Sequence, residues 1–154
     1  MKIWVDADGC PARIRSIVEK ASLRTGVESV FVSDRPMPVR ENETVSVVRV
    51  QPGEDRSDDH ILQHSSGGDL AVTRDVLLTE RLVEKGVLVL DDRGGVYTRE
   101  NIRERVSERE RMMEFRSMGI FPEKGREALG EREIKAFAAA FDRELSRLIR
   151  DRSE

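Results

Sequence analysis

The stretch KIWVDADGCP at residues 2–11 runs from an apolar segment straight into two aspartates, a glycine, a cysteine and a proline. One polar residue is enough to end a buried strand in a turn, and Asp6 would supply it. The second carboxylate, Asp8, adds electrostatic repulsion that a bound cation would relieve. Because Pro11 suits the first position of a helix, the stretch predicts a strand, an acidic turn and a helix in immediate succession.

Apolar runs and helical patterns alternate from this point to residue 90. The alternation predicts an α/β fold, a three-layer sandwich with a mostly parallel sheet. Ser57 has a side chain suited to capping a helix, and residues 34–44 have the prolines and charges of a loop. The expected strands cover residues 3–5, 29–33, 45–50, 70–73 and 87–90, and the expected helices cover residues 11–25, 58–64 and 76–85.

The C-terminal part of the chain has the composition of helices. Ten of the twelve aspartates lie before residue 99, whereas glutamate, which suits helix surfaces, prevails after it. Thr98 is expected to cap a helix, and a late apolar stripe predicts an amphipathic helix. We therefore expect a single domain over residues 1–154, with an α/β core at 1–98 followed by C-terminal helices at 99–154.

Charge and composition limit the classes of partner. The formal net charge of −3 excludes a protein that binds nucleic acid through an overall positive charge. The interleaved arginines and glutamates of residues 99–116 are interpreted as a solvated helix face with i,i+4 pairs, and a surface for nucleic acid or a partner is the alternative. No apolar stretch approaches the roughly 18 residues of a membrane span, no signal peptide is recognised, and there is one cysteine. These features predict a cytoplasmic protein without membrane association.

Aspartates follow three of the expected strands. Asp6 and Asp8 follow the first strand, Asp75 follows residues 70–73, and the pair Asp91 and Asp92 follows residues 87–90. Because ligands of an open parallel sheet bind beyond the carboxyl ends of its strands, these side chains are expected to meet at one edge. Clustered carboxylates suit Mg²⁺ or Mn²⁺, either of which can activate water and neutralise a phosphodiester.

Other charged residues are assigned to one edge or the other by position. Asp58 and Asp59 open a helix after the third strand, which is compatible with the same edge. Asp69 precedes its strand, so we expect it at the opposite edge in a structural role. The arginines expected near the carboxylates, as phosphate contacts or as solvated surface residues, are Arg13, Arg15 and Arg74.

An apolar strand followed by D-x-D-G resembles the first motif of haloacid dehalogenase-like phosphatases. That resemblance implies Asp6 as the nucleophile and Asp8 as the general acid/base, with Ser33 and the Asp91-Asp92 pair in the place of later motifs. Those enzymes insert a helical turn and a hairpin after the motif. In this chain a helix is expected at once, from Pro11.

Four runs together resemble the YaiI/YqxD family, a bacterial group, in the same order and spacing over essentially the whole chain. The family pattern usually has alanine at Gly9, and it gives Asp59 and Asp92 less weight than Asp6, Asp8, Asp55, Asp58, Asp69 and Asp75. The four runs are DADGCP at 6–11, PGEDRSDDHI at 52–61, GDLAVTRD at 68–75 and GEREIKAFAAAF at 130–141.

This family in turn resembles PIN-like nuclease domains, which implies that fold and a metal-dependent hydrolysis of RNA. Asp6 matches their first aspartate, Asp58 opens their D-x-x-I, and Asp75 ends their T-x-D. The resemblance implies that these three hold Mg²⁺ or Mn²⁺, with Asp8 as a further ligand or a water-orienting carboxylate. The aspartates assigned with lower priority are Asp55, Asp59 and Asp92.

The glutamate that many PIN domains add from an intervening helix has no clear counterpart in this chain. A second metal ion and catalysis itself therefore stay open at this point. We expect a metal-dependent phosphodiesterase acting on RNA. The phosphatase and a non-catalytic module that binds nucleic acid are the alternatives.

Overall fold

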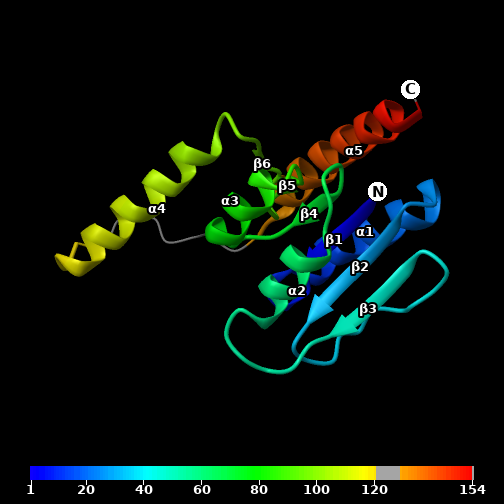
Figure 1. Cartoon of the computed structure of the whole chain (residues 1–154), viewed down its shortest axis with the longest axis horizontal. Coiled ribbons are helices and arrows are strands. Elements are labelled where there is room, and N and C mark those ends of the chain that lie inside the picture. Colours follow the sequence, from blue (N-terminus) through cyan, green and yellow to red (C-terminus); the bar gives the residue numbers. More distant parts are fainter. Residues whose placement is uncertain (121–128, 154) are drawn as a thin grey trace.

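A six-stranded sheet forms the centre of the molecule, with helices on both of its faces (Figure 1). The computed structural model describes residues 1–120 and 129–153. In space the strands follow the order β3-β2-β1-β4-β5-β6, and all neighbours are parallel except the antiparallel pair of β5 and β6. The strands are β1 (Lys2–Asp6), β2 (Glu28–Ser33), β3 (Val45–Arg49), β4 (Leu70–Val72), β5 (Leu88–Leu90) and β6 (Val96–Tyr97). The helices are α1 (Ala12–Thr25), α2 (Arg56–His64), α3 (Val76–Glu84), α4 (Ile102–Ser117) and α5 (Glu131–Ser153), and the 3₁₀ turn η1 (Ala7–Gly9) joins β1 to α1.

Side chains of each strand point alternately to the two faces of the sheet. In β1, Ile3 and Val5 lie in the core shared with α1 and α5, and Trp4 lies in the core shared with α2 and α3. On the first face, the rings of Phe137 and Phe141 in α5 stack with centroids 5.4 Å apart. The three-layer α/β prediction and the amphipathic C-terminal helix are therefore confirmed.

The expected order of elements up to residue 90 is confirmed with bounds shifted by one or two residues, but both expected helix caps are wrong. The helix α2 begins two residues early, behind Asp55 with its left-handed φ of 61°, so Ser57 lies inside the helix. The helix α4 begins at Ile102 with Asn101 in the N-cap position, so Thr98 lies before the cap. The carbonyl oxygen of Thr98 accepts a hydrogen bond from the Ile102 N–H at 3.0 Å. The helical prediction for residues 121–128 lies outside the described residues. Among the helices of the described ranges, none is both long enough and apolar enough to cross a bilayer.

The hairpin of β5 and β6 is not predicted by the sequence pattern, because β6 has two residues. Asp91 builds its turn by accepting hydrogen bonds from two backbone N–H groups of the turn and, at 2.5 Å, from the Tyr97 hydroxyl. Gly94 has a φ of 87°, and a Cβ there would lie 2.7 Å from the carbonyl oxygen of Ala136. The turn therefore requires glycine, since the hairpin packs directly on the backbone of α5.

The strand order creates a crevice at the carboxyl ends of β1 and β4. After β1 the chain builds β2 and β3 on one side, and it then crosses to build β4 and β5 on the other. The loops that leave β1 and β4 consequently diverge. Open parallel sheets bind their ligands where the order reverses in this way.

Candidate functional site

The crevice holds carboxylates from the ends of both strands. Asp6 is the last residue of β1, and Asp75 lies between β4 and α3. The Thr73 hydroxyl joins them, because it donates to Asp6 Oδ2 at 3.0 Å and accepts from the Asp75 N–H at 3.1 Å. Asp75 Oδ1 caps α3 by accepting from the N–H groups of Leu77 and Leu78 at 2.9 and 3.1 Å. The fold thus fixes one oxygen of each carboxylate.

Asp58 adds a third carboxylate from the first turn of α2. Its carboxyl group shares a hydrogen bond with that of Asp75. Burial, this hydrogen bond and the nearby charges of Asp75 and Asp6 raise the pKa of Asp58 to about 7. Burial also raises the pKa of Asp6, helped by the charges of Asp8 and Asp75 and opposed by the hydrogen bond from Thr73. Three elements therefore bring Asp6, Asp58 and Asp75 within repulsive range of one another.

Asp8, in the η1 turn, is surrounded by hydrogen-bond donors. Ser33 Oγ, at the end of β2, donates to Asp8 Oδ1 at 2.5 Å, and the Asp34 N–H donates to Oδ2 at 2.9 Å. The Ser57 hydroxyl of α2 reaches the same Oδ2 at 3.3 Å. Burial acts to raise the pKa of Asp8, but the hydrogen bonds from Ser33 and Asp34 outweigh it and lower this pKa below its ordinary value. The ionised carboxylate of Asp8 therefore joins η1 to the end of β2 and to α2 through hydrogen bonds.

A cleft of about 770 Å³ opens beside the crevice. Asp6, Asp75 and the backbone around them form one side, and α4 forms the other. In Figure 1 α4, drawn in yellow, projects from the body of the molecule and begins close to α3. The α4 residues that line the cleft are Arg105, Glu108, Arg109, Met112, Met113 and Arg116.

The interpretation of residues 99–116 as a solvated helix face agrees with the exposure of most α4 side chains, and one side of this helix also lines the cleft. The spacing of Arg105, Arg109, Met112 and Arg116 is four, three and four residues, which places them on one side of a helix. That spacing is a signal present in the sequence. Its meaning depends on where α4 packs, and no local pattern gives that position.

The donor chemistry of Asp6, Asp58 and Asp75 fits a hard divalent cation. Mg²⁺ and Mn²⁺ take carboxylate oxygens and would relieve the repulsion that, after burial, contributes to the raised pKa values of Asp6 and Asp58. Within residues 1–120 and 129–153, however, no three His, Cys, Asp or Glu side chains already stand in an arrangement that holds a metal ion. Metal binding by Asp6, Asp58 and Asp75 would therefore require their side chains to move.

The arginines expected near phosphate lie in different places. Arg74 lines the cleft, with its Nη1 3.6 Å from Asp92 Oδ2. Arg13, on α1, instead forms an ion pair with the first residue of α5. Arg15 Nη1 donates to the carbonyl oxygen of Cys10 at 2.6 Å. The structure brings Arg74, and neither of the other two, to the cleft lining.

The lower-priority aspartates are also separated. Asp92 lines the cleft and is 1% exposed. Asp55 is exposed in the turn before α2, and its charge contributes to the raised pKa of Asp58. Asp59 is exposed on α2. The chain neighbours Asp58 and Asp59 thus occupy different environments on the same helix turn.

Asp69 lies at the opposite edge of the sheet, as its position before β4 predicts. Its carboxylate is buried and accepts three hydrogen bonds, from the Lys2 N–H at 2.9 Å, the Trp4 indole at 3.0 Å and the Ser66 N–H at 2.9 Å. These bonds join the start of β1 to the turn before β4. The structural role expected for Asp69 is confirmed.

Comparison with known proteins gives the family. Residues 4–147 match the model described as "Uncharacterized BCR, YaiI/YqxD family". The chain is 45% identical over 150 residues to a UPF0178 protein of Myxococcus xanthus (strain DK1622), an alignment that covers 97% of each chain. It is 43% identical over 150 residues to a UPF0178 protein of Treponema pallidum (strain Nichols), with 97% of this chain and 84% of the relative covered. At Gly9, where the resemblance leads us to expect alanine in relatives, a Cβ would lie 3.5 Å from Arg74 Nη2, which is an ordinary contact distance. The chain belongs to the YaiI/YqxD family.

Proposed function

We propose that this protein hydrolyses phosphodiester bonds of RNA with the help of Mg²⁺ or Mn²⁺. The observation that carries the proposal is the meeting of Asp6, Asp58 and Asp75, from three elements, at the crevice where the strand order reverses. Neighbouring carboxylates among which some have a raised pKa, as Asp6 and Asp58 do here, are typical of metal and catalytic sites. The resemblance of these positions to the motifs of PIN-like nucleases directs the proposal to RNA.

The residues of the site divide the work. Asp6, Asp58 and Asp75 would hold the ion, which supplies an activated water and neutralises charge on the phosphate. Asp8 keeps its charge beside Asp6 and orients water from a fixed position, because its hydrogen bonds hold it in place. Arg74, on the cleft lining, offers a guanidinium to the substrate phosphate.

The test is the cleavage of a labelled single-stranded RNA by the wild-type chain in Mn²⁺ and in EDTA, with Asp6→Asn and Asp58→Asn as variants. We expect cleavage in Mn²⁺, its loss in EDTA, and a fall of at least about a hundredfold in each variant. Asp59→Asn is the matched control, because Asp59 adjoins Asp58 on α2 but is exposed. Equal losses in Asp58→Asn and Asp59→Asn would contradict the assigned site.

The same preparations separate the two alternatives. Mn²⁺ binding in calorimetry without any cleavage would leave a non-catalytic binding module. Turnover of a small phosphate ester through a phosphorylated Asp6 would establish a phosphatase. The lowered pKa of Asp8 disfavours that outcome, since the phosphatase reaction needs Asp8 to donate a proton.

A further inference from the structure

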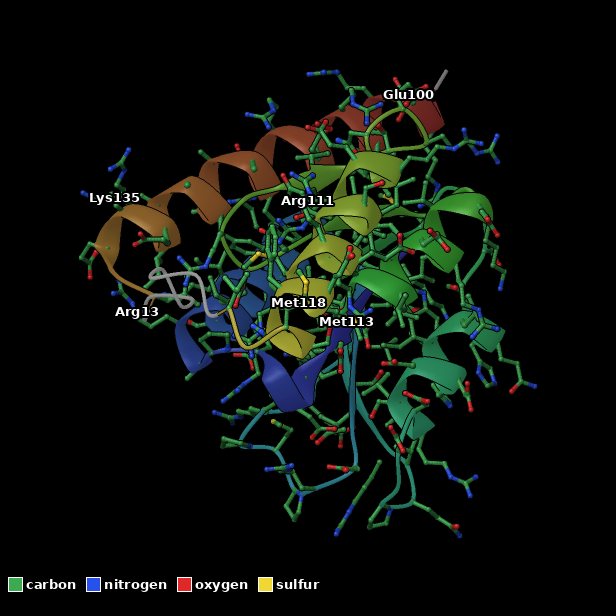
Figure 2. The ribbon with its side chains drawn as sticks, turned by 90° about the vertical axis from the view of Figure 1, so that its left-hand side faces the viewer. Arg13, Glu100, Arg111, Met113, Met118 and Lys135 are labelled. Carbon is green, nitrogen blue, oxygen red and sulfur yellow. The ribbon has the colours of Figure 1, made fainter. Side chains whose placement is uncertain are left out.

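The cleft has two walls of different charge. The side formed by the sheet edge carries three aspartates and Arg74, whereas α4 presents a stripe of three arginines and Glu108. Figure 2 views the molecule from the side of α4, which stands in front of the sheet with Arg111 and Met113 labelled on it. The arginines of the stripe are Arg105, Arg109 and Arg116.

The three arginines of this stripe are not equivalent. Arg105 is held by Glu108, with Nη1 3.4 Å from Oε2, and its guanidinium lies 5.9 Å from the centre of the Tyr97 ring. Within the described residues, no carboxylate forms an ion pair with Arg109 or Arg116. Arg109 Nη1 instead lies 3.2 Å from the Met113 sulfur. Arg105 therefore supports the wall, and the other two present positive charge to the cleft.

We propose that α4 binds the sugar-phosphate backbone of a single nucleic-acid strand and holds it across the carboxylates, with Arg109 and Arg116 as the phosphate contacts. This inference rests on the proposed function, because it places the substrate of that site. The two contacts lie seven residues apart on one face of α4, which is two helix turns or about 10 Å along the axis. Guanidinium groups bind phosphate oxygens in a bidentate manner.

The size and lining of the cleft specify the strand. A volume of about 770 Å³ is that of a small-ligand site, which is enough for a short length of single strand. Among the lining residues that the structure describes, none is aromatic, so the cleft offers no ring on which bases stack. Met112 and Met113 offer apolar contact without base-specific hydrogen bonds. We expect recognition of the backbone with weak preference for base sequence.

The experiment is fluorescence anisotropy with a labelled 12-nucleotide single-stranded RNA, the matching single-stranded DNA and the RNA duplex of the same sequence, in EDTA and in Ca²⁺, at several salt concentrations. The test variant is Arg109→Ala/Arg116→Ala, and the matched control is Arg103→Ala/Arg111→Ala. The control removes the same charge from the same helix at exposed positions outside the cleft lining. Both substitutions keep helix propensity high.

We expect the test variant to bind RNA about tenfold or more weakly for each lost contact, with a salt dependence reduced by about 0.7 per contact. The control should bind like the wild-type chain, and Arg109→Lys/Arg116→Lys should retain part of the affinity because it keeps the charge. Comparable affinity for RNA and DNA would assign recognition to phosphate, and a preference for RNA would assign it to the 2′-hydroxyl as well.

Three results would overturn the inference: no binding of either strand by the wild-type chain in both buffers, equal losses in test and control variants, or tighter binding of duplex. Each is distinct from a failure of the proposed function. Binding that depends on Arg109 and Arg116 without cleavage in Mn²⁺ would contradict the nuclease proposal and support strand binding by α4. Cleavage at the wild-type rate by Arg109→Ala/Arg116→Ala would support the nuclease and contradict strand binding by α4.

Discussion

The two ends of β4 hold aspartates in opposite circumstances. Asp69, before the strand, is buried and accepts hydrogen bonds from three N–H groups. Asp75, after the strand, caps a helix with one oxygen and faces Asp58, whose pKa is raised to about 7. The hydrogen-bond donors that the fold places around Asp69 satisfy its carboxylate. Asp75 instead belongs to a group of carboxylates whose negative charges repel one another.

The difference teaches how to separate structural from functional carboxylates in this chain. A buried carboxylate that is matched by donors stabilises the fold, and its removal leaves those donors unsatisfied. Carboxylates that repel one another cost stability, and they persist where a ligand repays that cost. Asp69 and Asp91 belong to the first class, and the proposed function assigns the cluster of Asp6, Asp58 and Asp75 to the second.

The largest expected effect on stability is that of Asp69→Ala. The substitution leaves the Lys2 N–H, the Trp4 indole and the Ser66 N–H without their acceptor, and each unsatisfied group costs about 1–3 kcal/mol. We expect the free energy of unfolding to fall by about 3–5 kcal/mol, measured by urea denaturation in EDTA.

The contrast is sharpened by Asp58→Ala in the same experiment, which should leave stability unchanged or raised. Asp59→Ala serves as the surface reference. A loss for Asp58→Ala as large as that for Asp69→Ala would break the comparison, because it would make the cluster part of the structural framework.

The next effect in size is stabilisation by the cation. An ion that binds the folded chain alone adds about 2.7 kcal/mol to the free energy of unfolding at a concentration one hundred times its dissociation constant. We expect Mn²⁺ to raise the melting temperature of the wild-type chain and of Asp59→Asn. Asp6→Asn and Asp58→Asn should lose most of this shift. A full shift in Asp6→Asn would place the ion elsewhere.

Much of the site follows from the sequence, because it depends on rules that hold for every parallel sheet. Asp6 and Asp75 leave neighbouring strands at their carboxyl ends, so their meeting is predicted once the strands are recognised. Asp58 opens a helix that returns to the same edge. Asp69 precedes its strand, and the same rule places it at the far edge.

The parts that the sequence does not give depend on long-range packing. Asp91 follows a strand as Asp75 does, yet its side chain is used inside the hairpin of β5 and β6. Its carboxylate accepts a hydrogen bond from the hydroxyl of Tyr97, which lies in the two-residue strand β6. Ser57 has the character of a helix cap, but α2 starts earlier and delivers its hydroxyl to Asp8. The position of α4 against the cleft likewise depends on long-range packing, since α4 packs against α3.

The smallest of the three effects concerns pH and tests the cluster directly. Asp58 has a pKa of about 7 in the folded chain and about 3.8 as its ordinary value, so between these values the folded chain binds more protons than the unfolded chain. The free energy of unfolding therefore falls as pH rises through this window and levels off above it. The effect is modest because Asp58 is half-buried and solvent screens its charge.

Asp58→Asn removes this proton linkage, so in EDTA its stability relative to the wild-type chain should increase from about pH 4 to about pH 8. Urea denaturation across that range, with Asp59→Asn as the reference, measures the difference. In excess Mn²⁺ the order should reverse, because the ion binds deprotonated carboxylates and the wild-type chain gains stability as pH rises. A difference in the free energy of unfolding between Asp58→Asn and the wild-type chain that is the same at every pH would show that the pKa of Asp58 is not raised in the folded chain. The proposal that the cluster binds a cation would then lose its main support.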